Sequence, residues 1–243
     1  MLEGTDMIDL DLELIQQQAI EAYPNEAIWF VTDDGCYQVE NIHEDPENFF
    51  LASAADSLQA IQNNLKAVIH SHCDGYPVPS AEDMRLHEKL AVPCGILETN
   101  GISATEISWM SKLLKPLEGR SFMHGISDCF SIVKDYYTLR GVNLEEVPRD
   151  WLWWEKGDNF LEELFSSRGF VEVQANEARE GDAWVAQIRG PVIHHCGILL
   201  GNDLILHHPG SGDPVDRTKL SIQEPIYRYL PYIKKFLRHK ELA

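Results

Sequence analysis

The sequence has few basic residues. Across 243 residues, 20 Lys and Arg stand against 39 Asp and Glu, and the formal net charge is −19. A field of this sign repels phosphate backbones, so we expect no nucleic-acid partner. The charge favours solubility, or docking onto a basic surface of another protein.

Closely spaced cysteines are also missing. The odd number and wide spacing of the cysteines predict reduced thiols in a protein made in a cytosol, because a disulfide framework uses paired, regularly spaced cysteines. With 44% hydrophobic residues, the chain can bury a sizeable core without such bridges. The five cysteines are Cys36, Cys73, Cys94, Cys129 and Cys196.

Long apolar runs are absent as well. No stretch approaches the roughly 20 apolar residues that span a bilayer, so we expect no stable membrane insertion. The acidic segment 1–11 lacks the basic start and apolar run of a secretory signal, and we expect any export to use another route. Internal repeats and low-complexity tracts are likewise not evident in the sequence.

Periodicity divides the chain into two parts. Residues 111–119 contain Lys-Pro and Glu-Gly and show no period, which predicts a linker between a domain over 1–110 and a domain over 120–243. The second part shows helices first and short strands afterwards, which predicts an α+β domain. The expected helices are 10–22, 53–65, 80–90, 128–139 and 160–167, and the expected strands are 27–32, 35–42, 66–72, 95–99, 106–109, 171–173, 183–188, 195–200 and 204–208.

The first candidate site combines a strand with the start of a helix. Because side chains alternate along a strand, His70 and His72 project from the same face. Asp83 falls in the first helical turn after a short loop. Two histidines and one carboxylate leave a fourth position for water, which is typical of a catalytic zinc site and predicts zinc as the cofactor.

Structural explanations of the same residues remain open. Ser80-x-x-Asp83 before an apolar helix also fits a capping box. Histidines on a strand are often polar edge residues. A general base for a zinc site would come from further upstream, where the residues alone do not decide between Glu21 and Glu26.

The joint spacing His-x-His-x7-Ser-x2-Asp resembles the JAMM (MPN-type) metallopeptidase motif. The resemblance implies an α/β domain with a mixed sheet, with His70, His72 and Asp83 as zinc ligands. It implies that Ser80 hydrogen-bonds the water or the developing oxyanion. Tyr-Pro-Asn-Glu resembles the family's upstream segment and implies Glu26 as general base. Ala-Ile-Trp replaces the small Cys-Gly pair usual after this glutamate, and we expect Trp29 to narrow the site.

The second candidate site opens the strongest helix of the second part. Cys129 falls in the first turn of this helix, where free N–H groups and the helix dipole favour a thiolate nucleophile. A turn centred on 201–203 places His195 and His207 close to opposite each other, as a base and its orienting partner. A small buried cysteine, or a second metal site at the paired histidines, would also fit these residues.

Asp128-Cys129, the segment His-Cys-Gly-Ile from 195 to 198, and His207 together resemble the NlpC/P60 cysteine peptidases. The resemblance implies a papain-like α+β domain with Cys129 as nucleophile, His195 as base and His207 as the third polar residue. The chain departs from the pattern in two ways. Phe130 replaces a common Ser-Gly after the cysteine, and Phe122 stands near the place of an upstream tyrosine that helps to form the oxyanion site.

Both domains in this order in one chain resemble tail-tip proteins of long-tailed bacteriophages. The resemblance implies synthesis in the host bacterial cytoplasm, other tail-tip proteins as partners, and action at the cell envelope. It implies cleavage of peptidoglycan stem peptides by the second domain and peptidase action on a protein during tail assembly by the first. A non-catalytic assembly factor is the alternative, and a cellular isopeptidase acting on a ubiquitin-like modifier is a more distant one.

Overall fold

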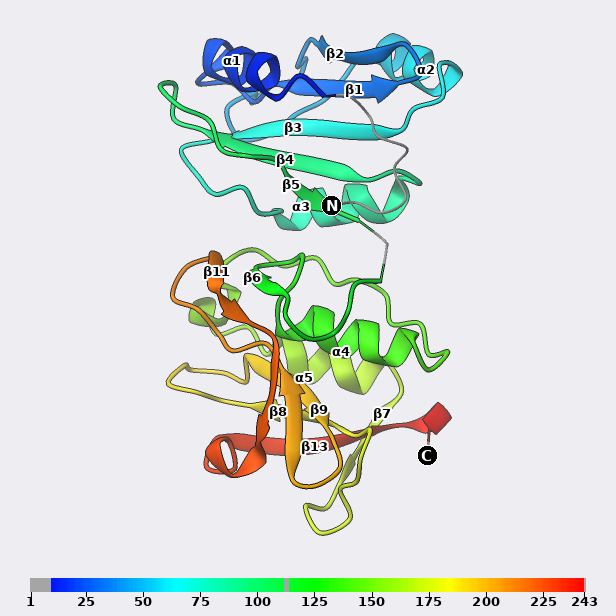
Figure 1. Ribbon diagram of the computed structural model, residues 1–243, viewed down its shortest axis with the longest axis vertical. Coiled ribbons are helices and arrows are strands. Elements are labelled where there is room, and N and C mark those ends of the chain that lie inside the picture. The colour runs from blue at the N-terminus through cyan, green and yellow to red at the C-terminus, as the bar shows by residue number, and fades with distance from the viewer. Residues whose placement is uncertain (1–9, 112–113, 243) are drawn as a thin grey trace. The chain divides into compact units, whose positions relative to one another are not determined.

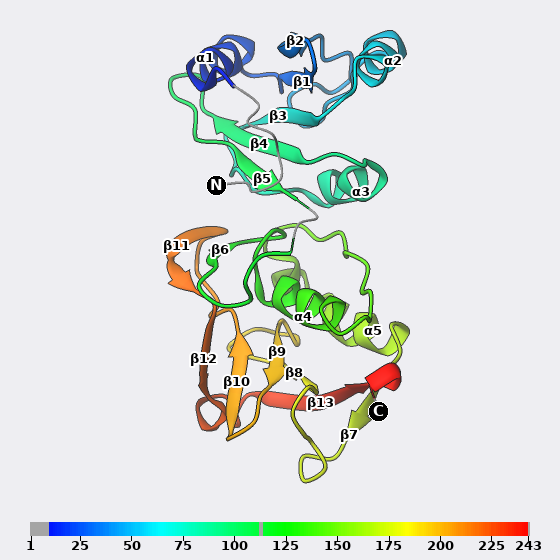
Figure 2. The ribbon, with the colours of Figure 1, turned by 45° about the vertical axis from the view of Figure 1, so that its right-hand side comes forward.

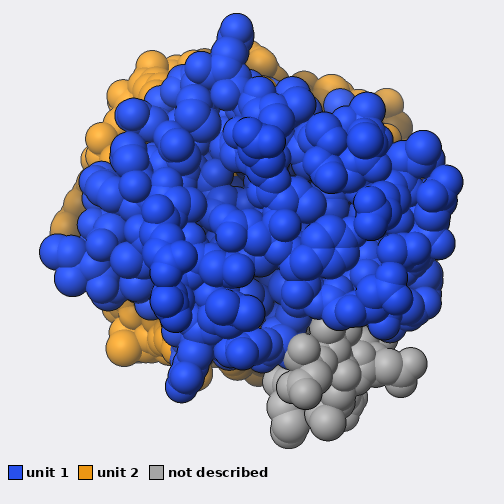
Figure 3. Space-filling model, turned by 90° about the horizontal axis from the view of Figure 1, so that it is seen from above, with its two compact units in different colours: residues 1–79, 85–112 blue, residues 80–84, 113–243 orange. Residues whose placement is uncertain are grey.

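The computed structural model describes residues 10–111 and 114–242. The chain divides into two compact units, residues 1–79 with 85–112 and residues 80–84 with 113–243 (Figure 3). Of the segments discussed above, the N-terminal stretch 1–11 falls mostly outside the described residues, as do residues 112 and 113 of the expected linker.

The first unit contains a mixed five-stranded sheet in the order β2-β1-β3-β4-β5 (Figure 1). Neighbours β3 and β4 pair in parallel, and the other neighbours pair antiparallel. The interior strand β1 is buried along its whole length, as expected of a strand covered on both faces. The strands are β1 (Ile28–Thr32), β2 (Gly35–Val39), β3 (Ala67–Cys73), β4 (Cys94–Thr99) and β5 (Ser108–Met110).

Two capped helices cover the two faces of this sheet. Helix α1 (Leu12–Ala22) begins where the Asp11 side chain accepts a hydrogen bond from the Leu14 N–H, and its buried Ile15 packs in a core with Trp29. Helix α2 (Ala54–Gln62) is capped by Ser53, and its Ala60 packs in a separate core. Helix α3 (Ala81–Lys89) follows β3 along the chain, and the division between the units passes through it.

The second unit contains an antiparallel six-stranded sheet in the order β12-β10-β9-β8-β13-β7, and a two-stranded sheet of β11 and β6. Its strands are β6 (Ser121–Met123), β7 (Phe170–Val173), β8 (Ala183–Ala186), β9 (His195–Leu199), β10 (Leu204–His207), β11 (Val215–Leu220), β12 (Ile222–Pro225) and β13 (Ile233–His239). Its helices are α4 (Cys129–Thr138), α5 (Phe160–Ser167) and the 3-10 turns η1 (Trp153–Lys156), η2 (Ile226–Arg228) and η3 (Lys240–Leu242).

Helix α4 packs on β9 and β10 (Figure 2). Its buried face forms part of the hydrophobic core of the second unit. Its fully buried Ile132 and Tyr137 join Ile198 and Leu206 of the sheet in one apolar cluster. The mixed α+β class expected from the sequence is therefore confirmed for the chain. No helix in the described ranges is both long enough and apolar enough to cross a membrane.

Candidate functional site

The Cys129 thiol stands at the first residue of α4, directly after the N-cap Asp128. Backbone N–H groups in a first helical turn have no acceptor within the helix, and the positive end of the helix dipole lies there. Cys129 is half-buried, so its sulfur is both shielded and reachable. These are the surroundings in which a thiolate is stabilised.

Two side chains of strand β9 stabilise the Cys129 thiolate. Hydrogen bonds from the Cys196 thiol and from His195 lower the pKa of Cys129 to about 5, against the opposing effects of burial and of the Asp128 charge. The same contact and complete burial raise the pKa of the Cys196 thiol well above its ordinary value. Of the two thiols, Cys129 is the one whose thiolate is favoured, and Cys196 remains a neutral donor.

A buried chain of hydrogen bonds extends away from the thiol. His195 Nε2 lies 2.9 Å from His207 Nδ1, and His207 Nε2 lies 2.7 Å from the Glu224 carboxylate. All three side chains are buried. Burial lowers the pKa of both histidines, and the contact with Cys129 acts in the opposite direction on His195.

Glu224 fixes the protonation pattern of both rings. A carboxylate only accepts, so His207 Nε2 must carry the proton that it shares with Glu224. In the neutral ring, His207 Nδ1 is then an acceptor and receives the N–H of His195 Nε2. His195 Nδ1 is then the nitrogen toward Cys129. It accepts the thiol proton, as a general base requires, and once protonated it donates to the thiolate.

Glu224 was not among the residues selected from the sequence. It lies on β12, and besides His207 it binds Arg228 at 2.7 Å and the Tyr229 hydroxyl at 3.0 Å. Burial raises the pKa of its carboxyl, but the hydrogen bonds from His207, Arg228 and Tyr229 outweigh burial, and the net shift is downward. Its sequence neighbours, Gln223 and Pro225, form neither a motif nor an apolar run, so no local signal marked it.

The pairing of β9 with β10 is centred on Asn202, within the turn expected from the sequence, but the two histidines are not opposite each other. His207 pairs with Gly197, so it is a diagonal neighbour of His195 and does not lie opposite it. The Leu200 N–H donates to the Leu204 carbonyl oxygen at 2.8 Å across a three-residue turn, in which Asn202 and Asp203 have positive φ, of 61° and 58°. A turn centred on Asn202 pairs His207 with Gly197, so His195 lies two positions from the residue opposite His207.

Glycine at position 197 allows this diagonal contact. A Cβ there would lie 2.6 Å from the Leu206 carbonyl oxygen, 2.6 Å from the Trp184 ring and 2.8 Å from the His207 Cβ. Tyr229 also packs edge-on against His207, with the two ring centroids 4.7 Å apart. The two histidines thus lie in an aromatic enclosure that excludes water.

The thiol and its base face a cleft of about 760 Å³. Cys129, His195 and Phe122 all line it. Phe122 is on β6 and has no hydroxyl, so this position does not supply the side-chain donor that an oxyanion needs. The backbone N–H groups at the start of α4 remain as donors.

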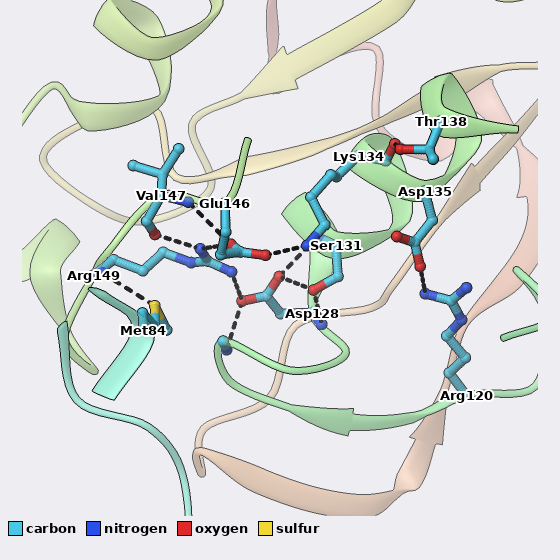
Figure 4. A network of polar contacts seen from close by, with 11 residues as sticks. Met84, Arg120, Asp128, Ser131, Lys134, Asp135, Thr138, Glu146, Val147 and Arg149 are labelled. Carbon is cyan, nitrogen blue, oxygen red and sulfur yellow. Dashed lines mark hydrogen bonds and ion pairs between the residues drawn. The ribbon is translucent and has the colours of Figure 1, made fainter. Parts of the chain in front are cut away.

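A buried ionic network fixes the residue that precedes the nucleophile (Figure 4). Arg149 donates to Asp128 at 2.6 Å and to Glu146 at 2.7 Å, and Lys134 binds the far side of Glu146. Ser131 completes a reciprocal capping box with Asp128. Burial raises the pKa of the Asp128 carboxyl, but Arg149 and these hydrogen bonds overcome it and hold the pKa far below its ordinary value.

The residues of the first candidate site also converge. His70, His72 and Asp83 each offer one ligand atom, and these atoms all lie within 4.8 Å of one another. His70 Nε2 and His72 Nε2 face each other at 3.1 Å. His72 Nδ1 hydrogen-bonds the Tyr76 carbonyl oxygen at 3.0 Å, which directs the Nε2 lone pair into the cluster, and the Phe50 ring stacks on His70. This donor set fits zinc.

Ser80 and Asp83 form the capping box that was the structural alternative. Asp83 Oδ2 accepts from the Ser80 backbone N–H at 2.8 Å and from its hydroxyl at 2.7 Å, and the Asp83 N–H donates to Ser80 Oγ. The cap orients the Asp83 carboxylate among the cluster atoms. Capping and metal binding are therefore compatible at this helix start.

Glu26 is buried immediately before β1. Ala27 and Ser71 exchange hydrogen bonds, at 2.8 Å from the Ala27 N–H to Ser71 Oγ and 3.0 Å from the Ser71 N–H to the Ala27 carbonyl. The antiparallel register continued by one residue places Glu26 across from His72. Glu21 is exposed on α1 and accepts a hydrogen bond from Gln17. Glu26 is the better placed of the two carboxylates.

Trp29 does not narrow this site, contrary to expectation. Ile28 pairs with His70, and Trp29 pairs with the next residue, Ile69. Because side chains alternate, the Trp29 indole points to the opposite face of the sheet, where it hydrogen-bonds Gln18 of α1 at 2.7 Å.

Comparisons with known proteins agree with the geometry of the second unit. Residues 119–233 match the NlpC/P60 family. The tail tip assembly protein K of Escherichia phage lambda is 30% identical over 157 residues, which cover 64% of this chain and 76% of that protein. The tail tip assembly protein K of Escherichia phage N15 is 28% identical over 205 residues, 81% and 83% of the two chains.

A crystal structure of a NlpC/P60 family protein from Bacillus cereus is a looser match. It is 13% identical, with a TM-score of 0.34, over 93% of this chain and 67% of the other. The sequence relatives are close enough and long enough to assign the chain. It belongs to the family of the tail tip assembly protein K, and it carries an NlpC/P60 cysteine-peptidase domain.

Proposed function

We propose that this chain is a phage tail-tip component that cleaves the peptide stems of bacterial peptidoglycan. The observation that carries the proposal is the connected set Cys129, His195, His207 and Glu224, of which Cys129 and His195 line one cleft. We assign it to a cysteine-peptidase domain over residues 120–243. The bond between D-glutamate and diaminopimelate is the expected site of cleavage.

Each proton that moves during the proposed reaction is accepted and returned by these residues. The Cys129 thiol loses its proton to His195 Nδ1, and the thiolate attacks the scissile carbonyl carbon. Backbone N–H groups at the start of α4 receive the developing oxyanion. The amide C–N bond then breaks, and His195 Nδ1 gives its proton to the leaving amine. Water then enters, loses a proton to His195 and hydrolyses the thioester, and that proton returns to the thiolate.

The test is release of stem-peptide fragments from purified peptidoglycan. We expect the wild-type chain to release them and Cys129→Ala to release none, with Cys36→Ala as a control thiol outside the cleft. Unchanged release by Cys129→Ala would contradict the peptidase. If both Cys129→Ala and wild type release nothing, and phages carrying Cys129→Ala still form plaques, the chain is a non-catalytic assembly factor.

We propose residues 1–110 as a zinc-dependent peptidase domain of the JAMM type that acts on a protein during tail assembly. His70, His72 and Asp83 would hold the metal, which would supply Lewis-acid polarisation of a water and of the scissile carbonyl. Glu26 would accept the proton of the attacking water and pass it to the leaving amine. Ser80 would hydrogen-bond the oxyanion.

Metal content tests this second proposal without any knowledge of the substrate. We expect about one zinc per chain after purification without chelator, and loss of that zinc in His72→Ala and Asp83→Ala. His43→Ala is the matched control, because His43 is a half-buried histidine of the same unit outside the cluster. Zinc retained in both ligand variants would exclude the assigned ligand set.

The proposed setting follows from the relatives, whose names describe tail tip assembly. We propose that other tail-tip proteins are the partners of this chain. The chain would be made in the host cytoplasm and act at the envelope of the next cell.

A further inference from the structure

Carboxylates are scarce in the wall of the Cys129 cleft. Among the described residues that line it, Asp128 is the one carboxylate, whereas three guanidinium groups line it, those of Arg149, Arg189 and Arg228. The whole chain shows the opposite balance, with 39 acidic and 20 basic residues. A guanidinium in this wall that has no carboxylate partner would therefore favour an anionic ligand.

Two of the three guanidinium groups already have carboxylate partners. Arg149 is buried between Asp128 and Glu146, and Arg228 binds Glu224 at 2.7 Å. Arg189 is exposed and makes no hydrogen bond or ion pair with any residue that the structure describes. Arg189 is therefore the guanidinium in the cleft that is free to bind a ligand.

The backbone around Arg189 is fixed although its side chain is free. The Gln187 side chain donates to the Gly190 carbonyl oxygen at 2.9 Å, and the Gln187 N–H donates to the Tyr232 carbonyl at 3.0 Å. A Cβ on Gly190 would lie 2.9 Å from the His194 ring, so this loop packs closely on the residue that precedes the base His195.

Arg189 itself has a φ of 56°, which lies in the left-handed region. A residue with a Cβ adopts this region at a cost, and such strain is concentrated at ligand-binding positions. The loop thus fixes the backbone from which an unpaired guanidinium reaches into the cleft. A merely solvated arginine needs neither the strain nor the packed loop.

We propose that Arg189 binds a substrate carboxylate next to the scissile amide, and so selects peptides in which this carboxylate is free. The inference rests on the proposed peptidase function and names the substrate group that the cleft recognises. The planar fork of a guanidinium binds a carboxylate through two parallel hydrogen bonds. A carboxamide at the same place offers one acceptor and no charge.

Binding to the Cys129→Ala chain separates recognition from turnover. The probes are two synthetic stem peptides that differ only in the α-group of the glutamyl residue, which is a carboxylate in one and a carboxamide in the other. We expect calorimetry to give about tenfold tighter binding of the carboxylate peptide, or about 1.4 kcal/mol. Adding Arg189→Gln should abolish that preference.

Arg179→Gln in the same background is the control, because Arg179 is another exposed arginine of this unit outside the cleft. It should keep the tenfold preference. Equal binding of the two peptides, a preference that persists in Arg189→Gln, or no binding of either peptide would overturn the inference. A preference that depends on Arg189 in a chain whose wild type cleaves neither peptide would refute the peptidase proposal and leave the carboxylate site standing.

Discussion

His207 stands between an acceptor and a donor, with its Nε2 2.7 Å from the Glu224 carboxylate and its Nδ1 2.9 Å from His195 Nε2. The carboxylate at one end determines which nitrogen of each ring is protonated. The base strength of His195 toward Cys129 is therefore controlled from a residue two hydrogen bonds away. Glu224 is a positioning residue, because it acts on the nucleophile through the two histidines.

Replacing Glu224 should slow cleavage without preventing substrate binding. In Glu224→Gln the side-chain amide can turn its N–H₂ toward His207, which favours the unproductive tautomer of both rings. We expect kcat on stem peptides to fall by about tenfold or more, with KM little changed. Glu163→Gln, at an exposed position of α5, should leave both constants unchanged. An equal fall of kcat in both variants would show that Glu224 does not position the two histidines.

The pH dependence of alkylation reports on the Cys129 thiolate directly. Because the pKa of Cys129 is lowered to about 5, its reaction with iodoacetamide should reach half of its maximal rate near pH 5 and stay high above it. Cys196→Ala removes a donor to the thiolate, so the midpoint should move upward toward the ordinary thiol range. Cys196→Ser keeps a donor and should shift it less. Identical midpoints in all three chains would contradict the role of Cys196.

The Arg149 network should contribute strongly to the stability of the second unit. Arg149→Met leaves Asp128 and Glu146 buried without their cation, and we expect a loss of about 3–5 kcal/mol in the free energy of unfolding. Arg168→Met, which removes a partly exposed ion pair with Glu145, should cost less than about 1 kcal/mol. Urea unfolding followed by tryptophan fluorescence measures both. Comparable losses in the two variants would show that burial of the network adds nothing to the free energy of unfolding.

Acid should weaken this unit through Asp128. The folded-state pKa of this carboxyl lies far below the unfolded value of about 3.9, so the unfolded chain binds the proton more readily. The stabilisation is therefore complete above about pH 5 and is lost progressively as the pH falls. Asp128→Asn should flatten the dependence of unfolding free energy on pH between 5 and 3, relative to the exposed control Asp158→Asn. Parallel curves would exclude Asp128 as the cause.

Zinc should raise the melting temperature of the first unit. A ligand that binds only the folded state at about 100 times its dissociation constant stabilises that state by about 2.7 kcal/mol. We expect a concentration-dependent rise with zinc in the wild-type chain and none in Asp83→Asn, because His70 and His72 alone lack the third ligand. Calcium at the same concentrations is the control ion, since it prefers oxygen ligands. A rise of equal size in Asp83→Asn would exclude this carboxylate as a ligand.

Local sequence signals predicted the elements that carry the nucleophile and the metal cluster. Asp128 before an amphipathic stretch predicted the start of α4, and Ser53 and Ser80 marked two further helix starts. Alternation along the buried strand predicted that His70 and His72 share a face. These signals work because capping and alternation depend on residues only a few positions apart.

Partners from distant parts of the chain could not be predicted in this way. Glu224 reaches His207 because β12 pairs with β10 across 14 intervening residues that include β11. Arg149 reaches Asp128 from a segment without helix or strand. Strand β13 contains Lys234 and Lys235, and it is held as a strand by its pairing with β7 and β8. In each case tertiary contacts decide what local propensity leaves open.

The length of the turn at Asn202 and Asp203 constrains how this protein can vary. One residue inserted there would displace β10 by one position against β9, and His207 would then point to the opposite face of the sheet. The hydrogen bonds to His195 and Glu224 would both be lost although no catalytic residue had changed. The residue types at the tip of this hairpin can therefore vary among those that tolerate a positive φ. Insertions and deletions at the tip would not be tolerated.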